Sequence, residues 1–222
     1  MEVDGRRVED ELPGRQGRIL LAYLVTRRSR TITRDELVDA LWPAGRDGGL
    51  APLLSKLRRV VPLDGFRPAL DELWVDIEAA ATALHRAESA LAQGEPDAAW
   101  APSQVAMFTC GRPFLPGDEA PWIDEERRQL AELHLRALET YAAATLGVGG
   151  TELAAAIRVG RKLVQLEPYR ESGYRILMEA LEREGNCAEA LLVYESLREK
   201  LREELGITPS EPTQALHRRL LR

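Results

Sequence analysis

The stretch that decides the fold runs from Thr33 to Val61 and reads TRDELVDALWPAGRDGGLAPLLSKLRRVV. Thr33 and Glu36 have the spacing of a capping box, in which a hydroxyl and a carboxylate each bind a free backbone N–H at a helix start. The sequence therefore predicts a helix that begins at Arg34. Its apolar residues fall on one face at helical spacing, namely Leu37, Val38, Leu41 and Trp42.

The same stretch predicts a second helix after a break at Pro43 and Gly45. This helix restarts near Leu50, and Pro52 is tolerated in its first turn, where the missing N–H costs no hydrogen bond. Its apolar face consists of Leu50, Leu53, Leu54, Leu57, Val60 and Val61, and its polar side carries Ser55, Lys56, Arg58 and Arg59. Two short helices across a tight break, the second with a basic outer face, match a helix-turn-helix that places its second helix in the major groove of DNA. An ordinary amphipathic helix pair with a solvated charged face fits the same pattern.

The flanking segments predict a small N-terminal domain around this helix pair. Residues 3–8 read as an extended segment turned at Asp4-Gly5, which is a strong short-range hairpin signal. Residues 14–28 predict a central helix, because residues 19–25 are apolar nearly all round. Residues 66–76 read as a second short hairpin. A hairpin directly after a recognition helix is the wing of a winged helix.

Charge is unevenly distributed along the chain, whose formal net charge is −6. Residues 14–61 hold ten Lys or Arg against four Asp or Glu, a net of +6, whereas residues 78–222 hold seventeen against twenty-three, a net of −6. This asymmetry is expected of a DNA-binding segment attached to a protein-binding domain. The tip of the expected wing is different, because it carries Asp71 and Glu72 where phosphate contact calls for Lys or Arg, and Arg67 is its one base.

From Ile77 onward the sequence predicts a chain that is almost entirely helical. Gly and Pro are frequent in an expected loop at residues 109–121, and the expected helices cover residues 79–92, 96–108, 122–146, 152–166, 170–184, 188–205 and 212–222. Ala156 and Ala190, like Leu163 and Leu197, stand 34 residues apart, which is the tetratricopeptide period. Repeats of this kind stack and form a concave protein-binding surface. A helical core without a binding role is the plainer interpretation.

Composition and motif spacing argue against several other classes of protein. No apolar run approaches the roughly 20 residues needed to cross a bilayer, and the polar, acidic N-terminus is unlike a signal peptide, so we expect no membrane partner and a cytoplasmic location. Cys110 and Cys187 form no Cys-x-x-Cys pair, and we expect both to be reduced. His85, His134 and His217 are scattered over different expected helices, and there is no Walker-type phosphate loop and no nucleophile elbow. We therefore expect no enzyme activity, catalytic residue, metal site or cofactor.

A family resemblance is carried by segments in both halves of the chain. In the first half these are Val3–Arg6, Ser29–Pro43 and Ser55–Arg59. In the second half they are Pro121-Trp122, Glu125–Arg127, Glu167–Glu171, Ala190-Leu191 with Tyr194, Glu204–Ser210 and Leu216–Leu221. Together they resemble the antibiotic regulatory proteins of the Streptomyces type. These actinobacterial regulators pair an OmpR-like winged helix with a bacterial transcriptional activation domain.

The resemblance implies a mainly α fold with two domains. Residues 1–76 would form a winged helix-turn-helix with a small β-sheet and wing, and residues 77–222 an all-α, tetratricopeptide-like activation domain. The implied protein is an activator that binds direct repeats in double-stranded DNA near a promoter as a side-by-side dimer and recruits RNA polymerase. Its implied DNA contacts are Ser55, Lys56, Arg58 and Arg59 on base edges and phosphates, Thr33 and Arg34 on the backbone, and Arg67 in the wing.

Three features depart from the family pattern and leave a second hypothesis open. The first strand of the N-terminal sheet is almost absent, the break at Gly45–Gly49 is rich in glycine, and the expected wing is short with an acidic tip. Each lost phosphate contact lowers the salt sensitivity of DNA binding by about one charge. The alternative is therefore a protein-interaction or scaffold module that kept this architecture but does not bind DNA on its own.

Overall fold

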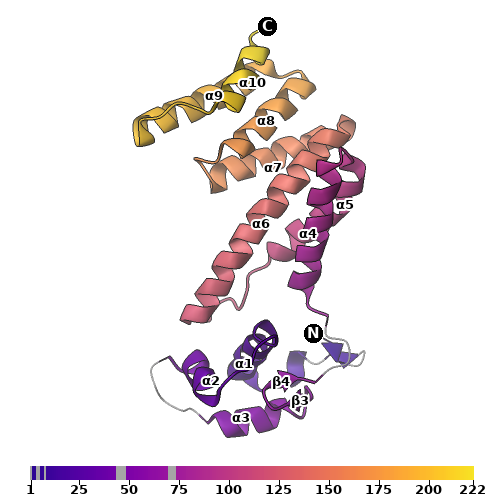
Figure 1. The fold of residues 1–222 in the computed structure, drawn as a ribbon, viewed down its shortest axis with the longest axis vertical. Helices are drawn as coiled ribbons and strands as arrows, with labels where there is room; N and C mark the ends of the chain where they lie inside the picture. Colours follow the sequence, from indigo (N-terminus) through magenta and orange to yellow (C-terminus); the bar gives the residue numbers. More distant parts are fainter. Residues whose placement is uncertain (1, 4–5, 8, 44–48, 70–73) are drawn as a thin grey trace. The chain divides into compact units, whose positions relative to one another are not determined.

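The structure, a computed structural model, describes residues 2–3, 6–7, 9–43, 49–69 and 74–222 (Figure 1). Helices dominate the described residues, and the strands there form two short antiparallel hairpins, so the predicted mainly α fold is confirmed. The chain divides into two compact units. The N-terminal unit comprises residues 1–73 and 113–128, and the C-terminal unit comprises residues 74–112 and 129–222.

The N-terminal unit opens with the expected hairpin. Strands β1 (Glu2–Val3) and β2 (Arg6–Arg7) pair antiparallel, with Val3 opposite Arg6. The Asp4-Gly5 turn between them lies outside the described residues. A 3-10 turn, η1 (Glu9–Glu11), leads into the helices. The remaining elements of this part are α1 (Gly14–Thr26), α2 (Arg34–Leu41), α3 (Leu50–Leu57), β3 (Leu63–Asp64) and β4 (Arg67–Pro68).

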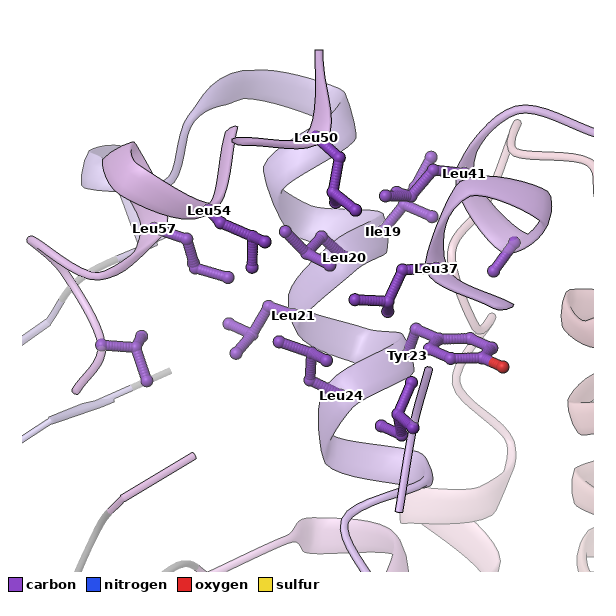
Figure 2. Close-up of a cluster of buried hydrophobic side chains, with 13 residues drawn as sticks. Ile19, Leu20, Leu21, Tyr23, Leu24, Leu37, Leu41, Leu50, Leu54 and Leu57 are labelled. Carbon is purple, nitrogen blue, oxygen red and sulfur yellow. The ribbon is translucent and has the colours of Figure 1, made fainter. Parts of the chain in front are cut away.

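Helix α1 is the centre of this unit, as its all-round apolar sequence predicts. Leu20 and Leu24 are fully buried, and Ile19, Leu21 and Tyr23 are nearly so. Figure 2 shows α1 between the other two helices, with the leucines of α3 (Leu50, Leu54 and Leu57) on one side and those of α2 (Leu37 and Leu41) on the other. Burial of a leucine side chain contributes about 1.5–3 kcal/mol. This cluster therefore holds α2 and α3 in place through α1.

The helix starts match the sequence prediction, but the end of α3 does not. Helix α2 begins at Arg34 and α3 at Leu50, with Pro52 in its first turn. Helix α3 ends at Leu57, so Arg58 and Arg59 lie in the turn that follows it. Pro62 disfavours a helical backbone at the residue before it, which limits how far the helix can continue.

The second hairpin lies earlier in the chain than residues 66–76. Leu63 pairs with Pro68 and Asp64 with Arg67, so the chain reverses at Gly65 and the next residue. Gly65 has a φ of 59°, which glycine adopts without steric strain and which suits a two-residue hairpin turn. Trp74 and Val75, expected in the returning strand, belong to no strand. The acidic tip expected at Asp71 and Glu72 lies outside the described residues.

The C-terminal unit is helical throughout its described length. Its helices are α4 (Asp76–Ala92), α5 (Pro96–Cys110), the later part of α6 (Pro121–Val148), α7 (Leu153–Leu166), α8 (Glu171–Glu184), α9 (Cys187–Lys200) and α10 (Glu211–Leu220). A 3-10 turn, η2 (Gly150–Glu152), precedes α7, and a π-helical segment, η3 (Leu201–Leu205), follows α9. No helix in the described part of the chain has both the length and the apolar character needed to cross a bilayer.

The predicted repeat of 34 residues is confirmed in the packing of α7 to α10. Helix α7 begins at Leu153 and α9 at Cys187, 34 positions later, and Ala156 and Ala190 are both fully buried. Helices α7 and α8 approach closely at two glycines. A Cβ atom at Gly160 would lie 3.0 Å from Cβ of Leu177, and one at Gly173 would lie 3.0 Å from Cβ of Leu163.

Candidate nucleic-acid interface

The basic residues predicted to contact DNA lie at the exposed end of α3. Ser55 and Lys56 are exposed on its last turn, and Arg58 and Arg59 are exposed just after it. The backbone N–H of Arg59 donates to the carbonyl oxygen of Lys56 at 3.2 Å, which continues the helical path for one more turn. The side chains are exposed because Leu54, Leu57 and Val61 occupy the buried face. The structure thus brings these four residues together.

The hairpin is tied to the same place. Arg58 donates from Nη2 to the carbonyl oxygen of Gly65 at 3.2 Å, which joins the end of α3 to the turn between β3 and β4. Arg67 is exposed on β4, opposite Asp64. Its positive charge therefore has a carboxylate as its strand neighbour.

Thr33 and Arg34 belong to a different helix, α2, whose start has the predicted capping box. Thr33 Oγ1 accepts from the N–H of Glu36 at 3.3 Å, and Glu36 Oε2 accepts from the N–H of Thr33 at 3.0 Å. Arg30 also binds the Glu36 carboxylate at 3.0 Å. The hydrogen bond from the Thr33 backbone, followed by that from Arg30, holds the pKa of Glu36 below its ordinary value. The Thr33 hydroxyl therefore has a structural role that its predicted DNA contact would share.

The arginines of the N-terminal unit fall into two groups. Arg15 and Arg27, near the ends of α1, pair with Asp118 and with Glu126, the latter at 2.5 Å. Lys56 and Arg59 have no carboxylate partner in the part of the chain that the structure describes. An exposed cation without an internal partner is free to meet an external anion. The positive charge available to a ligand is therefore concentrated at the end of α3.

The acidic partners belong to a segment that the sequence did not place in this unit, residues 113–128. Trp122 packs edge-on against Tyr23, with ring centroids 5.1 Å apart, and donates from Nε1 to the carbonyl oxygen of Ala40 at 3.1 Å. Arg127 donates to the carbonyl oxygens of Phe114 at 3.1 Å and Asp118 at 2.9 Å, which fixes the loop before α6. A tryptophan just after a proline in an otherwise acidic run was the available signal. Its partner could not be read from it.

The fold and this family of contacts can now be set beside known proteins. Residues 75–221 match the family described as the bacterial transcriptional activator domain, and the chain belongs to that family. The resemblance noted in the sequence is thereby confirmed for the helical half of the chain.

Two similar proteins are regulators from Streptomyces. The regulatory protein AfsR of Streptomyces griseus is 32% identical over 218 residues, which cover 93% of this chain and 22% of AfsR. AfsR of Streptomyces coelicolor is 33% identical, with the same coverage of 93% and 22%. The chain thus spans about a fifth of the length of these relatives.

A solved structure shares the fold. It is that of Mycobacterium tuberculosis EmbR in complex with a low affinity phosphopeptide, and it matches with a TM-score of 0.76 at 24% identity. The match covers 93% of this chain and 59% of that chain. The agreement therefore extends over both units of the present fold.

Proposed function

We propose that this chain is a DNA-binding transcriptional activator that binds direct repeats at a promoter and recruits RNA polymerase. The observation that carries the proposal is the group of exposed cations Lys56, Arg58 and Arg59 at the end of α3. Membership of the bacterial transcriptional activator domain family, and relatives that are named regulatory proteins, support it.

The proposed roles follow the predicted domains. Residues 1–76 act as a winged helix-turn-helix in which α3 is the recognition helix and the β3–β4 hairpin is the wing. Lys56, Arg58 and Arg59, with Ser55, contact base edges and phosphates, because guanidinium and ammonium groups are the usual donors to both. Thr33, Arg34 and Arg67 contact the backbone. Residues 77–222 contact RNA polymerase, and two copies bind side by side as a homodimer.

We further propose that the chain acts by binding alone, without catalysis or a cofactor. The relatives are named as regulators, not as enzymes. Among the described residues, no group of three or more His, Cys, Asp and Glu side chains is arranged to hold a metal ion. His85, His134 and His217 lie on α4, α6 and α10.

The test is the double substitution Arg58→Ala with Arg59→Ala. A base or phosphate contact is worth about 1–3 kcal/mol, so we expect affinity for a promoter fragment to fall at least about thirtyfold. Fluorescence anisotropy with a labelled duplex measures the affinity, and circular dichroism checks that helical content is retained. Arg59→Ala alone separates DNA contact from structure, because Arg58 also holds the hairpin through Gly65.

A matched control removes the same charge elsewhere. Arg86 and Arg222 are exposed and have no carboxylate partner among the described residues, so Arg86→Ala with Arg222→Ala should leave the affinity almost unchanged. Equal affinity of the Arg58/Arg59 variant and the native protein would remove the assignment of α3 as the recognition helix. It would favour the scaffold alternative, whose sequence basis, Asp71 and Glu72, lies outside the described residues.

A further inference from the structure

A second group of basic side chains lies on the outer face of α7, far in sequence from α3. A shallow groove of about 540 Å³, open to solvent, is lined there by Ala154, Ile157, Arg158, Arg161, Lys162 and Gln165, with Glu184 of α8 at its edge. These α7 residues recur at helical spacing and form one stripe along the helix. The opposite side of α7 packs into the repeat through Ala156, Val159 and Leu163.

The cations in this groove differ from the other arginines of the C-terminal unit. Arg136 pairs with Glu88 at 2.8 Å, and Arg170 pairs with Glu139 at 2.7 Å. In the groove, Arg161 pairs with Glu189 at 2.6 Å, but neither Arg158 nor Lys162 has a carboxylate partner among the described residues. In a segment where acidic residues outnumber basic ones, these two cations have been left without internal neutralisation.

Lys162 keeps its charge for an external partner. Its Nζ lies 3.4 Å from Nε2 of His134, a group that does not carry a negative charge. Burial, and after it the charge of Lys162, lowers the pKa of His134, so the imidazole is neutral at pH 7 and accepts a hydrogen bond from the ammonium group. The histidine therefore orients Lys162 without cancelling its charge.

We propose that the α7 groove binds an acidic peptide segment of a partner protein, with two carboxylates on Arg158 and Lys162 and an apolar side chain over Ala154 and Ile157. Arg158 and Lys162 are four positions apart on one helix and so about 6 Å apart along its axis. Two acidic residues one helical turn apart in the partner have the same separation. The apolar floor gives such a segment a contact that depends on side-chain shape as well as charge.

A peptide fits this groove better than a nucleic acid does. A duplex carries one negative charge per roughly 1.7 Å of its axis, and it would meet the field of the surrounding acidic residues as well as the groove. Residues 78–222 carry twenty-three Asp or Glu against seventeen Lys or Arg. A short peptide with two carboxylates meets only the local cations, because salt screens the more distant acidic residues beyond about 8 Å at physiological ionic strength.

The experiment measures peptide binding to the full chain by fluorescence anisotropy. The probe is a short fluorescein-labelled peptide with two glutamates one helical turn apart and a leucine on the same face, and its partner probe has glutamines in place of the glutamates. We expect the glutamate peptide to bind and the glutamine peptide to bind at least about tenfold more weakly, because charged contacts provide most of its specificity. Equal binding of the two peptides, or no binding of either, would overturn the proposal.

Charge reversal supplies the second arm. Arg158→Glu with Lys162→Glu should weaken the glutamate peptide at least about tenfold and restore binding when the peptide carries lysines in place of the glutamates. The control, Arg86→Glu with Arg222→Glu, makes the same change in net charge on exposed residues outside the groove and should leave peptide affinity unchanged. Failure of the lysine peptide to rescue the reversed groove contradicts direct pairing.

Two further readouts distinguish other occupants of the groove. The Arg158/Lys162 variant should bind the promoter duplex as the native protein does, so a loss of DNA affinity would reassign the groove to nucleic acid. Analytical ultracentrifugation should show the same oligomeric state for both proteins. A change in that state would mean that the groove receives a second copy of the chain, and the partner-peptide proposal would be wrong.

Discussion

A single carboxylate, Glu171 of α8, holds the start of the last helix. It accepts the backbone N–H of Ser210 at 2.9 Å, the hydroxyl of Ser210 at 2.6 Å and the hydroxyl of Thr213 at 2.5 Å. Thr213 is fully buried, so its hydroxyl depends on this partner. Burial by itself would raise the pKa of Glu171, but the hydrogen bonds from Ser210 and Thr213 outweigh it, and the pKa lies below its ordinary value.

The stabilising effect of Glu171 should therefore depend on pH. A carboxylate whose pKa is lowered by folding stabilises the fold above its unfolded pKa of about 4.3 and loses this effect as the pH falls through its folded value. We expect Glu171→Gln to lower the free energy of unfolding by about 1–3 kcal/mol at pH 7 and by progressively less below about pH 4. Thermal unfolding followed by circular dichroism across this range measures the difference.

The control for this variant is Glu199→Gln. Glu199 is exposed on α9 and has no hydrogen bond or ion pair among the described residues, so its loss should leave stability unchanged at both ends of the pH range. A Glu171→Gln defect that is equally large at pH 7 and at acidic pH would show that shape, not charge, explains the role of Glu171.

At this scale, the sequence predicts only what is local. The capping box of Thr33 and Glu36 is visible because both partners lie within one helical turn. The bonds from Ser210 to Glu171 join residues 39 positions apart, and no spacing rule links them. The exposed cations of α3 could be predicted from the polar side of one helix, whereas the tie from Arg58 to Gly65 required the position of the hairpin.

Among the elements, α6 contributes to both units. Its first residues, up to Arg128, belong to the N-terminal unit, and the rest belongs to the C-terminal unit. Helix boundaries were largely predictable because Pro, Gly and apolar periodicity act locally. Which unit the residues of a helix join was not, since the bond from Trp122 to Ala40 spans 82 positions. The hairpin was misplaced because Leu63 and Asp64 lack a strong strand signal.

The anchoring role of the first turn of α6 predicts the effect of Trp122→Ala. Loss of a packed tryptophan typically costs about 3–5 kcal/mol, and Trp122 is only partly buried, so we expect about 2–3 kcal/mol. Amides of α1, which packs against Trp122 through Tyr23, should exchange with deuterium roughly thirtyfold faster, and amides of α8 should not change. Mass spectrometry of peptides from both helices measures this.

Trp74 provides the matched control for that measurement, because it is 75% exposed. Trp74→Ala should leave exchange in α1 and α8 at the native rate. If Trp122→Ala also leaves α1 protected, residues 113–128 do not stabilise the N-terminal unit, and its stability comes from the cluster around Leu20 and Leu24 alone.

For the whole molecule, the distribution of charge matters more than its sum. The chain has a net charge of −6 but a net of +6 over residues 14–61. The five proposed DNA-contacting cations, Arg34, Lys56, Arg58, Arg59 and Arg67, would each release about one counterion. We expect the logarithm of the binding constant to fall with the logarithm of salt concentration with a slope of about −4 to −5 per bound protomer.

A salt titration on a promoter fragment and on a scrambled duplex of equal length measures that slope. A slope near twice this value on the promoter would indicate that two copies bind side by side. A slope of about −1 on both duplexes would contradict the proposed contact set, because too few phosphates would be neutralised.

The regular spacing of the C-terminal helices sets how this chain can change in length. Gly185, with a φ of 87°, ends α8, and Asn186 caps α9 by accepting the N–H of Glu189 at 3.3 Å. A duplicate of residues 153–186 inserted after Asn186 would start behind one such cap and finish at another, so the stack would grow by one helix pair with its helix starts satisfied. Insertions of other lengths would leave a helix without a neighbour. Growth by whole repeats is therefore the change that this architecture accommodates most readily.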